Sequence, residues 1–400
     1  TSPRSFRCTA RWACREEPGA LPLRLHTSHK LPPPTDPCGH PPGRRSLASA
    51  AGLFLLLLLG CGVLPRGAAM AAPAPPPAAT VPVTTLGRTS NMPVVGLGLW
   101  KAEAEVTTNA VKEAIKAGYR HLDGACDYGN EPAVGQGIKE SIEEGVCTRE
   151  DLFVVSKLWN TFHAGEHVEA ACRRTLQDLQ LDYLDLYLIH FPISLRYVDF
   201  ETRYPPEWTY DPTAAEPKLE FANVPYRETW EAMEQLVHKG LVRHIGVSNL
   251  PAIMVMDVLK YATIPPVTNQ IESHLLLQQQ PLIDWMTSQG IVTTAYSPLG
   301  SVSYVQLGGD NGLGRGLLDD PVVAALAAKH SKTPAQVCLR WNVQRGVVIV
   351  PKSTKPGRMA ENIDLFGWQL DEEDMTQLAA LDRNMRFNNP AIYAGCPIFA

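Results

Sequence analysis

The chain has 400 residues, of which 45% are hydrophobic, so it is long enough for one large domain or two ordinary ones. Residues 1–69 hold nine basic and three acidic side chains, which leaves 27 basic and 38 acidic side chains, a net charge of −11, for the remainder. An acidic body of this kind argues against non-specific nucleic-acid binding, although it permits a small local cationic pocket.

The first 80 residues differ in composition from the rest, and we expect them to lie outside the folded domain. Proline-rich stretches at 31–34 and 73–77 cannot build a packed core. Between them, Arg44 and Arg45 precede the apolar run 51–64, which is typical of a secretory signal and short for a membrane span of about 20 residues. Because the first methionine is Met70, residues 1–69 are alternatively translated upstream sequence or an organelle-targeting leader.

The cysteines favour a reducing compartment. Five of the nine lie after residue 69, an odd number with no CxxC pair, so neither a zinc site nor a disulfide framework is indicated. Reduced thiols are typical of the cytosol. We therefore expect a cytoplasmic protein with no metal site and no membrane partner.

From about residue 92 the chain alternates short apolar runs with segments of helical periodicity. The runs are rich in Val, Ile, Leu and Tyr and nearly continuous in hydrophobicity, which predicts strands that are buried on both faces of a parallel sheet. Eight such strands are predicted: Met92–Gly98, Tyr119–Gly124, Leu152–Lys157, Tyr183–His190, His244–Ser248, Val267–Glu272, Val292–Ser297 and Val347–Pro351.

Helical segments separate these strands, among them Glu105–Ala117, Glu166–Leu179, Tyr226–Lys239, Pro281–Ser288 and Thr333–Gln344. Eight strands that are each followed by a helical stretch predict an α/β fold, a (β/α)8 TIM barrel that fills residues 81–400. Two additional helices are expected at Asp320–His330 and Glu372–Asn384. Long connections at 192–225 and 299–319 follow strands, and we therefore place them at the C-terminal mouth, where active sites of such barrels form.

Four polar residues lie at or just beyond consecutive strand ends and carry a recognisable chemistry. Asp123, Tyr128, Lys157 and His190 supply an acid, a phenol, an amine and an imidazole. A neighbouring ammonium is expected to lower the pKa of the phenol, a carboxylate can pair with that ammonium, and an imidazole can orient a carbonyl oxygen. Taken singly, Tyr128 is more easily explained as a turn residue, and His190 as a core histidine, than as catalytic residues. Their joint placement favours a general acid that protonates a carbonyl.

A reductant is needed for such a reaction, but no G-x-G-x-x-G fingerprint and no P-loop is present. After the last strand, Lys352, Ser353, Thr354 and Arg358 cluster at a predicted helix start, where TIM barrels often bind phosphate. A basic surface loop is the alternative.

Further polar groups follow the later strands. The amides and hydroxyl of Ser248, Asn249 and Gln270 can hold a carboxamide, and Tyr296 can stack on a flat ring. A helix cap at Asn249 and a core aromatic at Tyr296 are the structural alternatives.

Together these residues resemble the aldo-keto reductase superfamily from about Val83 to Ala400. The motifs that carry the resemblance are Gly96–Trp100, Asp123 with Asp127–Glu131, Ser156–Trp159, Ile189–Pro192, Ile245–Asn249, Ala295–Ser297 and Pro351–Ser353 through Glu361–Asn362. The resemblance implies that Tyr128 is the proton donor, that Lys157 and Asp123 tune its pKa and that His190 orients the carbonyl. It also implies NAD(P)H bound without a Rossmann fold.

The resemblance assigns further roles residue by residue. Residues implied to bind the cofactor are Ser248, Asn249 and Gln270 at the carboxamide, Tyr296 against the nicotinamide, Ser297 and Leu299 beside it, Lys352, Ser353, Thr354 and Arg358 around a 2′-phosphate, and Glu361 and Asn362 at the adenine end. This set implies NADPH, with NADH possible. Residues implied to bind substrate are Trp100, Trp159, His190, Phe191 and Asn388.

Within the superfamily the chain is similar to xylose reductases and to plant aldose-6-phosphate reductases. It departs from the expected patterns at Thr354, at Asn389 and at His274–Leu277. The implied activity is reduction of an aldose by a monomer or homodimer that acts on a small molecule. Reduction of a phosphorylated aldose and a non-catalytic, nucleotide-binding regulatory barrel are the alternatives.

Overall fold

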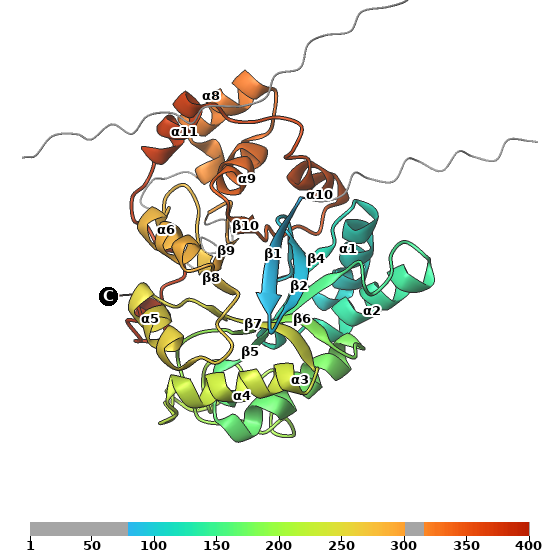
Figure 1. Cartoon of the computed structure of the whole chain (residues 1–400), viewed down its shortest axis with the longest axis vertical. Helices are drawn as coiled ribbons and strands as arrows, with labels where there is room; N and C mark the ends of the chain where they lie inside the picture. Colours follow the sequence, from blue (N-terminus) through green and yellow to red (C-terminus); the bar gives the residue numbers. More distant parts are fainter. Residues whose placement is uncertain (1–78, 301–315, 400) are drawn as a thin grey trace, which may run out of the picture. The chain divides into compact units, whose positions relative to one another are not determined.

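The computed structural model describes residues 79–300 and 316–399, so the predicted leader, residues 1–80, lies outside the described residues except for its last two. Eight parallel strands form one sheet in the order β10-β9-β8-β7-β6-β5-β4-β3, and helices surround it (Figure 1). The strands are β3 Leu97–Gly98, β4 His121–Asp123, β5 Phe153–Leu158, β6 Leu184–Ile189, β7 Val242–Ser248, β8 Thr268–Glu272, β9 Val292–Tyr296 and β10 Val348–Ile349. Each lies within or overlaps a predicted strand.

The two ends of this sheet also meet. Parallel bridges join Val95 to Ile349 and Gly98 to Lys352, as a barrel requires. At Gly98 a Cβ atom would lie 2.4 Å from the carbonyl oxygen of Val350. Only glycine permits this close approach of the two backbones. The curled parallel sheet therefore agrees with the predicted (β/α)8 architecture.

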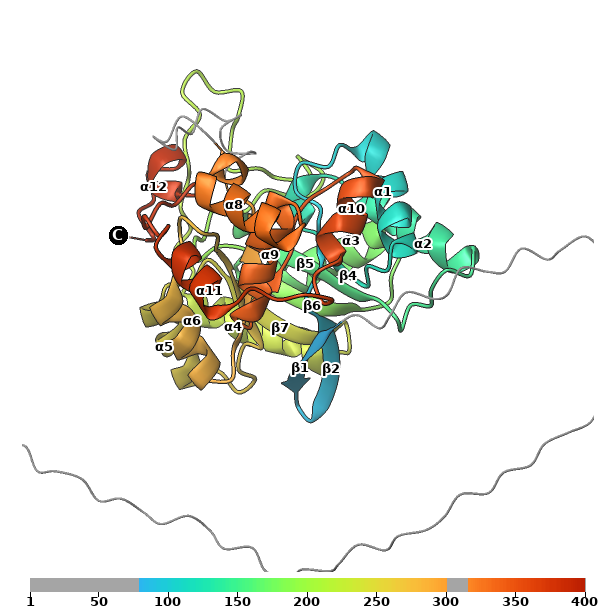
Figure 2. The ribbon, with the colours of Figure 1, turned by 90° about the horizontal axis from the view of Figure 1, so that it is seen from above.

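An antiparallel hairpin, β1 (Thr80–Thr85) and β2 (Arg88–Pro93), precedes the barrel. Its turn places Leu86 and Gly87 at positive φ, the geometry of a tight two-residue turn. The prediction of one strand over Met92–Gly98 was therefore wrong in part, because Met92 and Pro93 end β2. Figure 2 shows the hairpin at one side of the sheet.

His244, near the start of β7, attaches this hairpin to the barrel. Its two ring nitrogens hydrogen-bond to the hydroxyls of Thr85 and Ser90, each at 2.8 Å. Val83 and Met92 of the hairpin are buried in one cluster with Val155 and Val348 of the strands. The hairpin thus closes the N-terminal end of the barrel interior and leaves the C-terminal end for the site.

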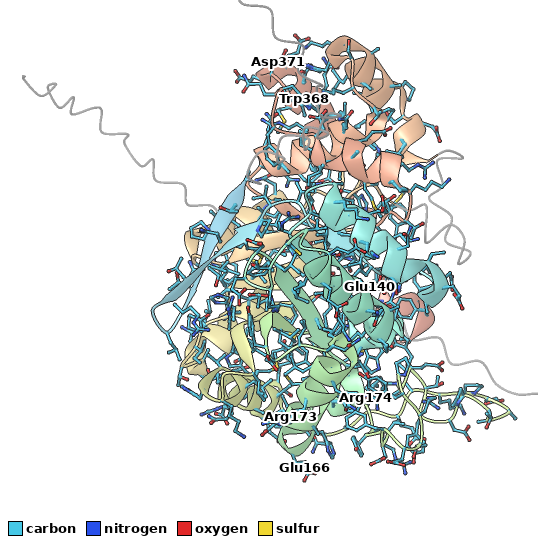
Figure 3. The ribbon with its side chains drawn as sticks, turned by 90° about the vertical axis from the view of Figure 1, so that its right-hand side faces the viewer. Glu140, Glu166, Arg173, Arg174, Trp368 and Asp371 are labelled. Atoms are coloured by element: carbon cyan, nitrogen blue, oxygen red, sulfur yellow. The ribbon has the colours of Figure 1, made fainter. Side chains whose placement is uncertain are left out.

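The helices pack an apolar face on the sheet and carry charge outward, as Glu140 on α2 and Arg173 and Arg174 on α3 show (Figure 3). Their bounds are α1 Ala104–Lys116, α2 Glu131–Glu143, α3 Gly165–Leu179, α4 Tyr226–His238, α5 Ala252–Tyr261, α6 Gln280–Ser288, α8 Pro321–His330, α9 Pro334–Gln344, α10 Pro356–Ile363, α11 Glu372–Ala379 and α12 Pro390–Tyr393. None of the helices in the described part of the chain is long and apolar enough to cross a membrane.

One helix is shorter than predicted. The sequence pattern favoured a helix over Glu372–Asn384, but α11 ends at Ala379. The backbone amides of Arg383 and Met385 instead donate to the carbonyl of Leu276, at 3.1 and 2.9 Å. These tertiary hydrogen bonds replace the helical ones and direct residues 383–388 toward the barrel mouth.

Candidate active site

The fold brings the four predicted catalytic side chains to the C-terminal ends of neighbouring strands. Asp123 ends β4, Tyr128 ends the short 3₁₀ helix η1 (Cys126–Tyr128), Lys157 lies in β5, and His190 follows β6. β4, β5 and β6 pair in that order. The order of the strands therefore places these side chains next to one another.

Lys157 is the centre of this group. Its Nζ donates to Oδ1 of Asp123 at 2.7 Å, to the carbonyl of Gly124 at 2.8 Å and to Oη of Tyr128 at 3.2 Å. The side chains of Lys157 and Asp123 are buried, so the ammonium needs these three acceptors. The contact with Tyr128 puts a fixed positive charge beside the phenolic oxygen.

The structure corrects the expected direction of the Tyr128 pKa. Burial, together with the nearby carboxylates of Asp123 and Asp127, raises the pKa of Tyr128 well above 10. The prediction of a lowered pKa is wrong because the sequence pattern does not reveal how deeply the phenol is buried. The phenol is consequently protonated at neutral pH, as a proton donor must be before it reacts.

His190 lies against the same phenol. Its ring is 5.9 Å from that of Tyr128 and 5.1 Å from that of Trp159, edge-on to both. Burial and the charge of Lys157 lower the pKa of His190 well below 6.5, so the imidazole is neutral. A neutral imidazole can donate one N–H to a carbonyl oxygen without competing for the proton of Tyr128.

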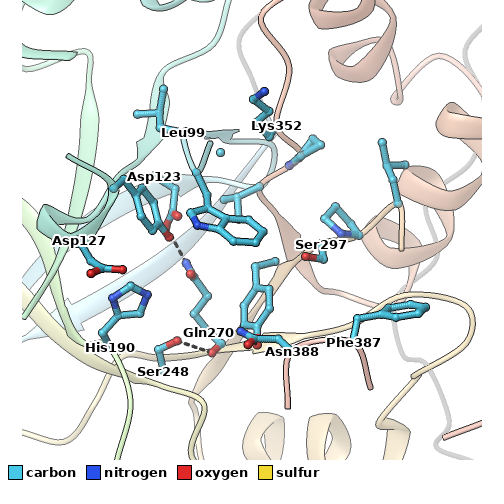
Figure 4. A pocket seen from close by; sticks show the side chains of 18 of the residues that line it. Leu99, Asp123, Asp127, His190, Ser248, Gln270, Ser297, Lys352, Phe387 and Asn388 are labelled. Carbon is cyan, nitrogen blue, oxygen red and sulfur yellow. Dashed lines mark hydrogen bonds between the residues drawn. The ribbon is translucent and has the colours of Figure 1, made fainter. Parts of the chain in front are cut away.

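Asp123, Tyr128 and His190 line a cavity of about 840 Å³ (Figure 4). The predicted substrate residues Trp100, Trp159, Phe191 and Asn388 all line it. Sequence reasoning missed several other lining side chains: Asp127, Trp208, Phe387, Ile392 and Tyr393. A signal existed for Trp208, which lies in the long connection rich in aromatics, and for Asp127, which precedes Tyr128.

The predicted carboxamide residues lie together but are also bonded to one another. Asn249, at positive φ, donates to the carbonyl of His190 at 2.9 Å and accepts from Oη of Tyr296 at 2.7 Å. Nε2 of Gln270 donates to Oδ2 of Asp123 at 2.6 Å. Gln270 therefore contacts the Lys157–Asp123 pair as well as the cavity that it lines.

The predicted phosphate residues line the same cavity at the start of α10. They are Lys352, Ser353, Thr354 and Arg358, with Ser297 and Leu299 nearby on the wall. Burial and the charge of Lys352 lower the pKa of Lys101. Lys101 therefore lies close enough to Lys352 for the two positive charges to repel each other. Glu361 and Asn362 lie further along α10 and are not among the lining residues. Within 79–300 and 316–399, no cluster of three His, Cys, Asp or Glu side chains suits a metal ion.

Comparisons with known proteins identify the family of the chain. The sequence pattern of the Aldo/keto reductase family matches residues 94–383. The chain is 50% identical over 325 residues to the probable NAD(P)H-dependent D-xylose reductase of Arthroderma otae, covering 81% of this chain and 98% of that protein. It is 48% identical over 320 residues to the NAD(P)H-dependent D-xylose reductase of Aspergillus niger, covering 80% and 99%.

A solved structure is similar as well. The aldose reductase from Schistosoma japonicum matches with a TM-score of 0.69 and 38% identity, over 79% of this chain and 97% of that one. The family match and these relatives show that the protein is an oxidoreductase. The chain belongs to the aldo/keto reductase family.

Proposed function

We propose that this chain uses NADPH to reduce the aldehyde of a neutral, xylose-like aldose to the alditol. The observation that carries the proposal is the 3.2 Å contact between Nζ of Lys157 and Oη of Tyr128, beside the neutral His190. The relatives named as D-xylose reductases support the substrate class. The working part is residues 81–400, a (β/α)8 barrel with α8 and α11 as additional helices.

Each side chain has one task in this reaction. His190 donates an N–H to the aldehyde oxygen and orients it toward Tyr128. Tyr128 gives its proton to that oxygen, and the resulting phenolate keeps its hydrogen bond from the Lys157 ammonium. Asp123 accepts a hydrogen bond from the Lys157 ammonium and holds it in place. The free-energy barrier to proton transfer from Tyr128 is lowered because the positive charge of Lys157 is already fixed beside the developing phenolate.

The residues of the cavity fit a nicotinamide cofactor. Ser248, Asn249 and Gln270 present hydroxyl and amide groups on the wall, and the cations Lys352 and Arg358 lie at its other polar end. The cation pair, with Ser353, suits a 2′-phosphate and favours NADPH over NADH. When bound, the cofactor supplies the hydride that the aldehyde carbon receives.

The charge of the cavity favours a neutral sugar over a phosphorylated one. Asp127 lies beside His190, while Lys352 lies on a different side of the cavity (Figure 4). Burial and the nearby Glu207 raise the pKa of Asp127 to about 7, so this group is partly ionised at neutral pH. A phosphate on the substrate would meet this carboxylate, because the described cations on the wall, Lys352, Lys355 and Arg358, lie toward α10.

The test compares two sugars on the purified full chain. NADPH oxidation is followed with xylose and with glucose 6-phosphate at equal concentration, and we expect xylose to give the higher kcat/KM. A preference for glucose 6-phosphate would overturn the substrate class. Tight NADPH binding without turnover of either sugar would instead indicate a non-catalytic regulatory barrel.

A further inference from the structure

The carboxylate of Glu272, at the end of β8, is buried and holds the C-terminal segment, residues 383–388. Its Oε1 accepts from the backbone amide of Phe387 at 2.8 Å, and its Oε2 accepts from the backbone amide of Asn388 at 2.8 Å. Nε2 of His274 donates to the same Oε1 at 2.8 Å. A fully buried carboxylate is costly without such donors, and here two of the three come from a segment more than a hundred residues away.

The segment held in this way reaches the cavity. Phe387 and Asn388 line it, and the side chain of Asn388 donates to Oη of Tyr296 at 3.0 Å. Tyr296 in turn donates to Oδ1 of Asn249 at 2.7 Å, and Oη of Tyr393 donates to Oδ1 of Asn388 at 2.8 Å. The orientation of Asn388 therefore depends on a backbone that Glu272 fixes and on the two tyrosine hydroxyls.

The turn after β8 is built to present this carboxylate. His274 and Leu277 exchange backbone hydrogen bonds, and Nδ1 of His274 accepts from the amide of Leu276, which leaves the proton on Nε2 for Glu272. The ring of His274 also packs on that of Phe387 at 5.1 Å. The turn therefore holds the Glu272 carboxylate in place and also packs against Phe387, an aromatic ring of the C-terminal segment.

We propose that Glu272 is a positioning residue for sugar binding. It acts through Asn388, by locking two consecutive amides of the C-terminal segment so that the Asn388 side chain faces the hydroxyls of the sugar. This role rests on the proposed function, in which Asn388 contacts the sugar. Glu272 itself does not touch the substrate, because it is buried behind the cavity wall.

The decisive variant is Glu272→Gln. A glutamine keeps the size of the side chain but replaces one oxygen with an NH₂ group, which faces a backbone N–H and cannot accept from it. Loss of these contacts is expected to raise the KM for xylose about tenfold while kcat changes little. The Kd for NADPH and the KM for propanal, which has no hydroxyl for Asn388 to bind, should stay at the wild-type values.

A double variant separates positioning from a general effect on structure. Asn388→Ala should raise the KM for xylose to a similar extent, and Glu272→Gln added to it should raise the KM no further. Arg386→Ala is the matched control, because it removes a different hydrogen bond of the same segment, the one that the Arg386 guanidinium donates to Oε1 of Gln279 at 3.2 Å. We expect it to leave the KM unchanged.

Three results would overturn the proposal. These are an unchanged KM in Glu272→Gln, multiplied effects in the double variant, or an equal rise of the KM for propanal. If Glu272→Gln does not fold, Glu272→Asp gives the same comparisons, because it keeps the charge but draws the carboxylate away from the two amides. A wild-type chain that does not reduce xylose would refute the proposed function itself, and with it this role.

Discussion

Nζ of Lys157 lies 2.7 Å from Oδ1 of Asp123, and both side chains are buried at the base of the cavity. The other carboxylate oxygen of Asp123 accepts from Gln270 at 2.6 Å. The pair is thus satisfied on both sides before any substrate arrives. The pair stabilises the fold, and in the proposed function it also supports catalysis. The two contributions can be separated by experiment.

Lys157→Met leaves the Asp123 carboxylate buried without its ion partner. We expect the free energy of unfolding to fall by about 3–5 kcal/mol and reduction of xylose to be lost. The double variant Lys157→Met with Asp123→Asn removes both charges and should recover much of the stability. It should recover none of the activity, since the positive charge beside Tyr128 is still missing. Urea unfolding and NADPH oxidation give the two measurements, and recovered activity in the double variant would contradict the assignment.

Tyr128→Phe tests the proposed role of Tyr128 as the proton donor. The phenyl ring keeps the packing against His190 and removes only the hydroxyl, so the fold and the Kd for NADPH should be unchanged. We expect kcat for xylose to fall by about 10²–10⁴-fold, the usual contribution of a positioned general acid. Fluorescence titration with NADPH and steady-state kinetics provide the readouts. Wild-type turnover by this variant would show that another group protonates the oxygen.

The barrel strands could be predicted from the sequence because each is a continuous apolar run, and the polar residue that ends a run is easily seen. Asp123, Lys157 and His190 were found in this way, and the order of the strands then brought them together. The long connection that holds Trp208 could be placed at the mouth of the barrel, but the sequence does not say which of its aromatic side chains lines the cavity. That depends on tertiary contacts such as the 2.9 Å hydrogen bond from Trp159 Nε1 to the carbonyl of Glu207, which no local pattern encodes.

Burial is the other quantity that the sequence does not reveal. A lysine near a tyrosine suggested a lowered pKa, whereas the depth of Tyr128 and the nearby Asp123 carboxylate raise it. The hydrogen bonds from the amides of residues 387 and 388 to Glu272 likewise join residues that are 115 and 116 positions apart in the chain, so no local pattern predicts them. Local sequence patterns predict where strands end, but the tertiary structure determines which residues each strand end contacts.

The cations after β10 predict a cofactor preference that can be altered. Lys352→Met with Arg358→Met should raise the KM for NADPH about tenfold or more, because in the proposed function both charges bind the 2′-phosphate. The KM for NADH should change by less than about twofold, since NADH lacks that phosphate. Lys332→Met is the control, because Lys332 pairs with Asp364 at 2.8 Å and is not on the cavity wall. An equal rise for both cofactors would place the 2′-phosphate elsewhere.

Glu131, the first residue of α2, makes stability depend on pH. Its buried carboxyl accepts from the hydroxyls of Ser156 at 2.6 Å and Thr175 at 3.1 Å, but burial outweighs these bonds and raises its pKa to about 7 from 4.5. Because the folded chain binds this proton more tightly than the unfolded chain, the contribution of Glu131 to stability is complete below about pH 4.5. It is lost as the pH rises through about 7.

Glu131→Gln mimics the protonated form at every pH. Its stability relative to the wild type should therefore rise by about 3 kcal/mol between pH 4.5 and 8, measured by urea unfolding. Glu140→Gln on the same helix is the matched control. The hydrogen bond from Lys112 lowers the pKa of Glu140. The small contribution of Glu140 to the free energy of unfolding is therefore lost as the pH falls, which is the opposite of the behaviour expected for Glu131. A Glu131→Gln difference that does not change with pH would show that this carboxyl is ionised in the folded chain throughout.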